Sequence, residues 1–85
     1  MPAIFRYKGF RFFFFSNEGY PLEPVHVHVR NGIKIAKFWI EPEVGLAASY
    51  DMSPSELNEI EGIIREKREL IKEAWNAYFG DSSGS

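Results

Sequence analysis

The chain has no cysteine among its 85 residues. A disulfide framework and a thiolate metal site are therefore excluded. Long apolar runs are also lacking, because the run Phe12 to Phe15 is far shorter than the roughly 20 residues of a membrane-spanning helix. The N-terminus lacks the apolar segment of a signal peptide. We therefore expect a soluble, cytoplasmic protein that does not enter a membrane.

Basic residues are few, and they are unevenly distributed. Residues 1–40 hold six basic residues and two acidic ones, whereas residues 41–85 hold four basic and ten acidic ones. Six cations make a small footprint for nucleic acid. The division predicts a basic sheet packed on an acidic helix. It leaves open a basic surface that receives phosphate or an acidic partner.

Aromatic residues are abundant, with eight Phe, four Tyr and two Trp. A chain of this length forms one domain with a small core, and large rings are an efficient way to fill it. We expect residues 1–80 to form a single α+β domain and residues 81–85 to form a flexible polar tail.

The segment Pro24 to Pro42 predicts a hairpin that turns at Asn31-Gly32, a dipeptide suited to tight turns. This loop would place Arg30 opposite Ile33, His28 opposite Ile35 and His26 opposite Lys37. Because side chains alternate along a strand, two faces follow. The core face would carry Val25, Val27, Val29, Lys34, Ala36, Phe38 and Ile40. The other face would carry His26, His28, Arg30, Ile33, Ile35, Lys37 and Trp39.

A second hairpin is expected over residues 3–7 and 10–16, with its turn at Lys8-Gly9. The expected pairs are Tyr7 with Phe10, Phe5 with Phe12, Ala3 with Phe14, Ile4 with Phe13, and Arg6 with Arg11. Like charges directly opposed in a sheet are unfavourable. Either both arginines are solvated or an anion lies between them.

The C-terminal segment predicts one long helix. Ser53, Pro54 and Glu56 match a capping box, and apolar residues recur at helical spacing up to Phe79. Its length, about 39 Å at 1.5 Å per residue, exceeds a four-stranded sheet. The helix therefore either curves, breaks near Gly62, or extends beyond the sheet at Leu70 to Phe79, where Trp75 would contact a partner or a second copy of the chain.

The expected fold is a four-stranded, mainly antiparallel sheet of two hairpins, covered by that single C-terminal helix. The intervening segment, Glu41 to Ser49, fits either a short helix or a loop.

The two histidines give the sequence its possible chemistry. His26 and His28 are two residues apart on a strand, so both imidazoles project from one face. Such a pair can bind a divalent ion, but no third ligand has a fixed spacing and Lys37 would repel a cation. We therefore predict no metal and no cofactor; if a metal binds, His26 and His28 are its ligands.

Three further interpretations remain, and in the simplest the histidines only hydrogen-bond backbone or carboxylate groups at a sheet edge. His26 and His28 could act as acid and base, with Arg30 and Lys37 stabilising a phosphoryl anion, as in a small ribonuclease or phosphodiesterase. Alternatively, the face is a binding surface for RNA, another phosphate ligand or a carboxylate. Its binding residues would be Arg6, Arg11 and Trp39, together with Trp75 on the helix.

The chain also resembles a known family. Three stretches carry the resemblance: Gly9 to Gly19, the Pro24 to Val29 segment with His-x-His, and Ala36 to Ile40. The closing Ala74 to Phe79 segment is similar as well. Together they resemble the bacterial family called domain of unknown function 4160. One departure is that Glu23-Pro24-Val25 precedes the histidines where the family has Pro-Pro.

The resemblance implies a small cytoplasmic bacterial protein encoded beside another small domain, an arrangement proposed for toxin–antitoxin-like pairs. It therefore favours an interaction module with a small protein partner. A ribonuclease is the alternative.

Overall fold

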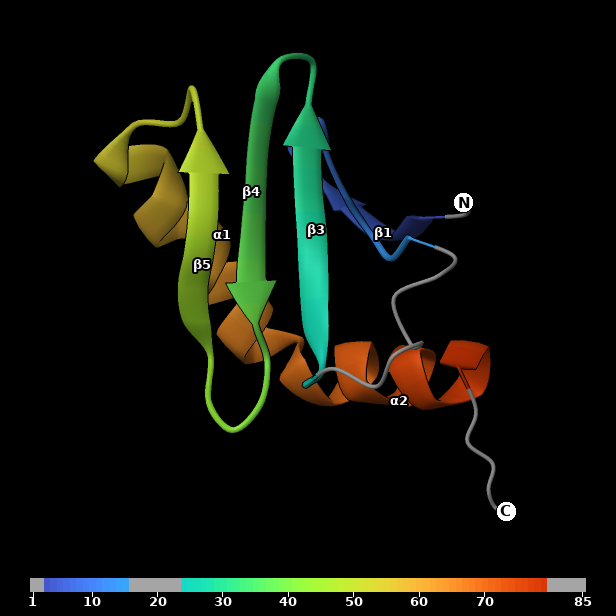
Figure 1. The fold of residues 1–85 in the computed structure, drawn as a ribbon. Coiled ribbons are helices and arrows are strands. Elements are labelled where there is room, and N and C mark those ends of the chain that lie inside the picture. The colour runs from blue at the N-terminus through green and yellow to red at the C-terminus, as the bar shows by residue number, and fades with distance from the viewer. Residues whose placement is uncertain (1–2, 16–23, 80–85) are drawn as a thin grey trace.

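The structure is a computed structural model that describes residues 3–15 and 24–79. Within these ranges, five strands form one antiparallel sheet in which each strand pairs with the next along the chain. The strands are β1 (Ala3–Tyr7), β2 (Phe10–Phe13), β3 (His26–Asn31), β4 (Lys34–Trp39) and β5 (Gly45–Tyr50), followed by the helices α1 (Pro54–Glu66) and α2 (Arg68–Phe79) (Figure 1). The α+β class and the two hairpins are confirmed.

The first hairpin turns at Lys8-Gly9, as predicted. Both residues have positive φ, 48° and 83°, which is the geometry of a tight turn that matches strand twist. The Arg6–Arg11 pairing is confirmed, but the predicted pairs of Ala3 with Phe14 and of Ile4 with Phe13 are wrong. Ala3 lies opposite Phe13 because an irregularity between Ala3 and Phe5 shifts the register.

The central hairpin turns at Gly32-Ile33, so the predicted Asn31-Gly32 loop is wrong. Asn31 pairs with Lys34. Of the two loop residues only Gly32 has positive φ, 64°, as in hairpin turns with glycine at the first central position. The observed pairs are Arg30 with Ile35, His28 with Lys37 and His26 with Trp39. This register differs from the predicted one by two residues, and a two-residue shift keeps every side chain on its face.

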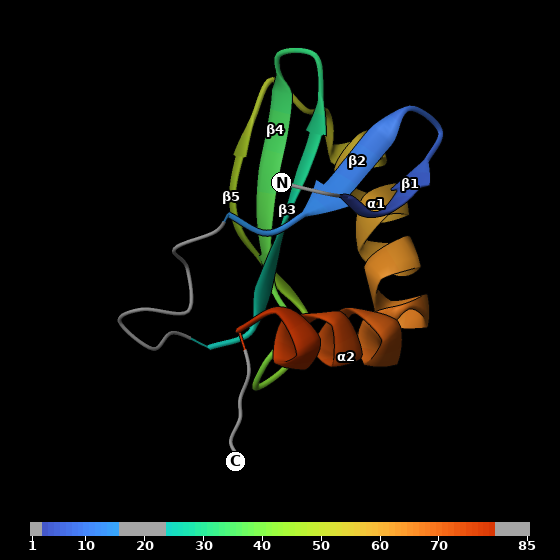
Figure 2. The same cartoon turned by 90° about the vertical axis from the view of Figure 1, so that its right-hand side faces the viewer.

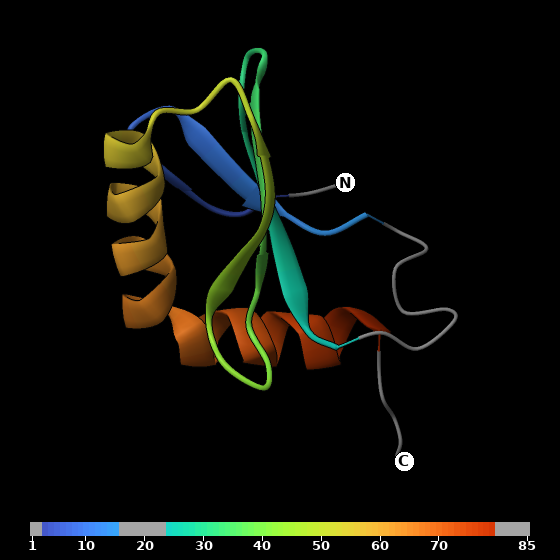
Figure 3. The same cartoon turned by 60° about the vertical axis from the view of Figure 1, so that its left-hand side comes forward.

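The core lies between the sheet and the helices. Val27, Val29 and Phe38 are fully buried on the sheet side, and Ile60 and Ile64 of α1 are buried against them. In Figures 2 and 3, α1 runs along one face of the sheet and α2 crosses one end of it. The predicted core face is therefore the face that α1 covers.

A fifth strand, β5, occupies the segment for which the sequence suggested a short helix or a loop, so the four-stranded sheet is wrong. Most of its side chains are exposed, and an exposed strand has weak periodicity in its sequence. Its register shifts between Lys37 and Phe38: Leu46 pairs with Phe38, whereas Ala48 pairs with Lys37. Ala47 is therefore the extra residue of a β-bulge.

The single long helix is also wrong. The capping box at Ser53 and Glu56 is confirmed, but α1 ends at a cap on Lys67, whose φ and ψ are −102° and 16°. A break near Gly62 was one alternative, and the observed break lies at Lys67. The overhang, another alternative, is not found, because Ile71 and Trp75 of α2 are buried. Bending the chain lets α2 cover the end of the sheet. Neither helix in the described ranges is long and apolar enough to cross a membrane.

Two polar contacts fix α1 to the sheet. The Tyr7 hydroxyl and the Lys8 ammonium donate to Glu59 Oε2 over 2.7 and 2.9 Å. The Lys34 ammonium donates to the carboxylate of Glu56. The hydrogen bonds from Tyr7 and then Lys8 hold the pKa of Glu59 below its ordinary value, and the same contact raises the pKa of Tyr7.

The Glu59 contact predicts an acid dependence of stability. A carboxyl group whose pKa is lowered by folding stabilises the protein above its ordinary pKa, and this contribution is lost as the pH falls through the lowered value. In urea unfolding at pH 7, Glu59→Gln should therefore be less stable than the wild type. The difference should shrink as the pH falls from about 4.5, the ordinary value, to 3.

Glu73→Gln is the matched control, because Glu73 is an exposed carboxylate on α2. It should leave the urea midpoint nearly unchanged over the same pH range. A difference between Glu59→Gln and wild type that stays constant from pH 7 to pH 3 would show that ionisation of Glu59 does not contribute.

Candidate binding face

The face of the sheet opposite α1 is called the open face here. The register assigns it these strand residues: Arg6, Arg11, Phe13, His26, His28, Arg30, Ile35, Lys37, Trp39, Ala48 and Tyr50. No Asp or Glu occurs in any of the five strands. The open face is therefore basic in its strand residues, as the sequence predicted for the hairpin face.

One row of side chains runs across all five strands, and its three arginines, Arg6, Arg11 and Arg30, are called the arginine row. Arg6 pairs with Arg11, Arg11 with Arg30, Arg30 with Ile35, and Ile35 with Tyr50. Three guanidinium groups thus occupy neighbouring strands, which are about 4.8 Å apart in a sheet. Arg6 and Arg30 are exposed. Like charges at directly opposed positions repel one another.

Two guanidinium groups of the row, those of Arg30 and Arg11, make local contacts. Arg30 Nε donates to the Gly32 carbonyl over 3.1 Å. The Arg11 guanidinium lies over the Phe13 ring, 5.2 Å from its centroid. These contacts leave the other guanidinium N–H groups of Arg30 to serve as donors.

Aromatic rings fill the next rows of the open face. Phe13 stacks near His28 at a centroid distance of 5.8 Å, and Phe15 meets the same imidazole edge-on at 4.5 Å. The Lys37 ammonium lies over the Trp39 ring at 4.6 Å. The Lys37–Trp39 pair is partly exposed, whereas Phe13 is buried. A partly exposed cation and ring favour ligands that carry both charge and flat apolar area.

A hollow of about 430 Å³ opens on the same face. Its lining is Phe15, His28, Ile35, Ala36, Lys37, Ala48, Ser49 and Tyr50. Tyr50 is 68% exposed and Phe15 is 48% exposed. Ile35 lines the hollow and lies directly opposite Arg30, so the hollow adjoins the arginine row.

His26 lies at the covered end of the open face and is fully buried. Its ring is 5.1 Å from Trp75 and 5.5 Å from Trp39 between centroids. Its Nδ1 lies 2.9 Å from the Pro24 carbonyl, and a carbonyl only accepts, so Nδ1 carries the proton. The sequence placed both histidines on one surface, but only His28 is partly exposed.

The four residues proposed for catalysis are thus divided by the structure. His28 lies directly opposite Lys37, and the next row places Arg30 opposite Ile35. The predicted partner of His26 was Lys37, but Trp39 takes that place. Among the described residues, no group of three or more His, Cys, Asp or Glu side chains could hold a metal ion.

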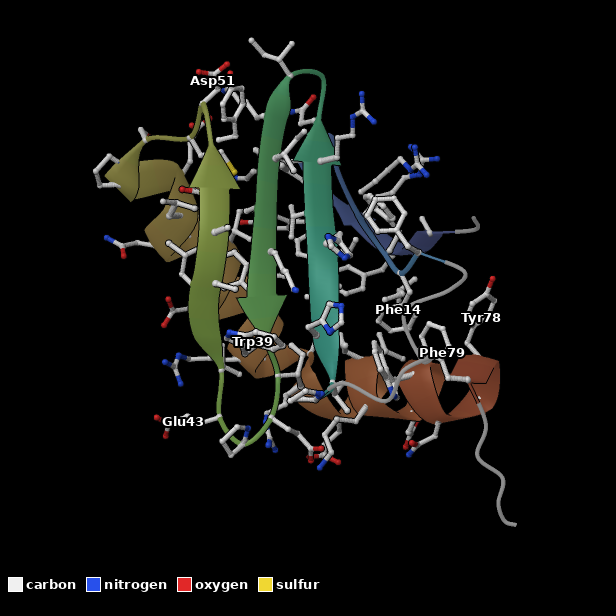
Figure 4. The ribbon with its side chains drawn as sticks, viewed as in Figure 1. Phe14, Trp39, Glu43, Asp51, Tyr78 and Phe79 are labelled. Atoms are coloured by element: carbon white, nitrogen blue, oxygen red, sulfur yellow. The ribbon has the colours of Figure 1, made fainter. Side chains whose placement is uncertain are left out.

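Trp75, predicted as a partner contact, is 5% exposed. Its ring packs on Phe14 and Phe79 at 5.2 and 4.4 Å, and Figure 4 shows Phe14 beside Phe79 at the C-terminal part of α2. The exposed apolar side chains of α2 are Leu70 and Tyr78 instead.

Sequence reasoning missed Tyr50 and Ala48, because β5 was not recognised as a strand. Their alternation was hidden by the extra residue Ala47. A signal was nevertheless present, since Leu46 to Tyr50 contains no charged residue and ends in an aromatic one.

A family model described as "Domain of unknown function (DUF4160)" matches residues 9–76, most of the chain. This confirms the resemblance seen in the sequence. Comparisons with curated proteins and with solved structures found no match.

The different burial of the two histidines predicts different effects on stability. His26→Ala removes a buried ring and its hydrogen bond to Pro24, so we expect a loss of about 2–4 kcal/mol in the free energy of unfolding. His28→Ala, the matched change at a partly exposed position on the same strand, should cost less than half as much. Urea unfolding measures both, and equal losses would contradict the assigned burial.

Proposed function

The chain belongs to the domain of unknown function 4160 family, and from its open face we propose that it is an interaction module that binds an anionic partner. The partner would be recognised by Arg6, Arg11 and Arg30, with Lys37 and Trp39 beside them. The arginine row is the observation that carries this proposal.

Charge pairing on the opposite side of the molecule supports the proposal. Cations at the helices pair with carboxylates: Lys8 with Glu59 at 2.9 Å, and Lys72 of α2 with Glu41 at 3.2 Å. Arg6 and Arg30, by contrast, form no ion pair with another described residue. Exposed cations such as Arg6 and Arg30 attract a ligand of opposite charge.

The resemblance to the family adds a biological setting. It implies a toxin–antitoxin-like pair, in which this chain would act together with a small protein encoded nearby. Carboxylates of such a protein and phosphates of RNA are both anions that the arginine row can bind.

The ribonuclease alternative has less support from the geometry. A paired acid and base need two accessible imidazoles within reach of one substrate, and His26 is buried beneath Trp75. His28, Lys37 and Arg30 remain together on the accessible surface and also serve the binding proposal.

Charge reversal tests the binding proposal. The wild type should be retained on a heparin column at pH 7, because heparin is a dense polyanion, and Arg6→Glu/Arg30→Glu should elute at clearly lower salt. Arg65→Glu/Lys72→Glu makes the same change in net charge on the helices and is the matched control. If the two double variants elute at the same salt concentration, retention depends only on net charge, and the proposal that the open face binds the polyanion is wrong.

Growth of a bacterial host tests the biological setting. In a toxin–antitoxin-like pair, the chain either arrests growth when expressed alone or relieves arrest caused by its neighbour. We expect Arg6→Glu/Arg30→Glu to lose that effect while the helix control keeps it. If neither the chain nor its neighbour alters growth in any combination, the toxin–antitoxin setting is wrong.

A further inference from the structure

We infer that the open face binds single-stranded nucleic acid, with phosphates on the arginine row and one base in the hollow beside Tyr50. This inference rests on the proposed function, because it names the anion that the open face receives. It also assigns a role to Tyr50 and Ala48 of β5, which line the hollow and are not part of the arginine row.

The row and the hollow form one continuous track. Passing from β1 to β5, the row presents three arginines, then Ile35, then Tyr50. Ile35 and Tyr50 both line the hollow. A chain molecule lying across the strands would thus meet cations over one half of the sheet and an apolar recess over the other.

The cationic half suits phosphate. Guanidinium groups present planar pairs of N–H donors that match phosphate oxygens, which is why arginine predominates where phosphates are bound. Arg6 and Arg30 are exposed at opposite ends of the three-arginine stretch. Successive phosphates of one strand could therefore be bound at separate points along the row.

The apolar half suits a base. Its volume of about 430 Å³ exceeds that of one planar ring system, and exposed rings stand at its rim, Tyr50 and Phe15. The Lys37 ammonium lies among its lining residues. Sheet faces that bind single strands combine aromatic platforms with cations in this manner, because every base has a flat apolar face that can stack.

Single-stranded nucleic acid matches both halves together. Its phosphates and bases alternate along one flexible chain, so charge and flat apolar area arrive at regular spacing. The stacked bases of a duplex are not available to enter the hollow. An acidic polypeptide would satisfy the arginine row but would not require an aromatic rim.

The experiment measures the affinity of the full chain for fluorescently labelled, unstructured oligonucleotides of about ten nucleotides by anisotropy. RNA and DNA of the same sequence show which of the two nucleic acids the face prefers. Poly-glutamate serves as the acidic polypeptide. The variants are Arg6→Glu/Arg30→Glu for the row and Tyr50→Ala for the hollow. Tyr78→Ala, an exposed tyrosine on α2, is the control for Tyr50.

We expect single strands to bind more tightly than a duplex of the same length and more tightly than poly-glutamate. Tyr50→Ala should weaken binding about tenfold with an unchanged salt dependence, because it removes a stacking surface and no charge. Arg6→Glu/Arg30→Glu should abolish measurable binding. Tyr78→Ala should bind like the wild type. A preference for RNA over DNA would indicate a contact to the 2′-hydroxyl.

Three results would overturn the inference, and they differ from failure of the proposed function. Poly-glutamate binding as tightly as the single strands would identify the ligand as an acidic protein. If Tyr50→Ala binds like the wild type, no base occupies the hollow. If the duplex binds more tightly than the single strands, the ligand is not a single strand. In each case arginine-dependent binding of a polyanion would survive, whereas the proposed function fails only if no polyanion depends on Arg6 and Arg30.

Discussion

The packing of Trp75 against Phe14 and His26 determines how the rest of the molecule is arranged. The indole can reach these rings only because the helical segment bends at Lys67 and directs α2 across the end of the sheet. That crossing places the Trp75 ring 5.1 Å from the ring of His26, which is fully buried. A single straight helix would not bring Trp75 to this end of the core.

Charge is divided between the two sides of the sheet for a physical reason. Strand residues that point toward α1 are mostly apolar, and the one cation among them, Lys34, pairs with Glu56 of the capping box. That hydrogen bond, followed by one from the Ser53 backbone, holds the pKa of Glu56 below its ordinary value. Since the carboxylates belong to the helices and loops, they neutralise cations near the helices. The strands themselves contain no Asp or Glu, so the strand residues of the open face contribute only basic charge.

The sequence predicted what depends on local pattern and missed what depends on tertiary packing. The helix start at Ser53 and the turn at Lys8-Gly9 follow from capping and turn chemistry, and both are confirmed. The faces of β3 and β4 were predicted correctly despite the wrong loop, because an error of two residues preserves alternation. The break at Lys67 has no Pro or Gly to mark it, and the burial of His26 depends on a residue almost fifty positions away. The arginines of the candidate binding face could be named from the sequence, whereas the hollow beside them could not.

The bulge at Ala47 affects both the direction of the Tyr50 side chain and the ability of the edge strand β5 to pair with other molecules. In a regular ladder continued from Leu46, alternation would turn Tyr50 toward the helices, whereas the extra residue turns it to the other side, opposite Ile35. A bulge also interrupts the even spacing of backbone donors and acceptors along an edge strand, which hinders pairing with strands of other molecules. The same irregularity of one residue therefore creates the aromatic rim of the hollow and protects an exposed, uncharged edge from aggregation. Loss of the bulge would turn Tyr50 away from the hollow and would leave a regular edge strand that can pair with strands of other molecules.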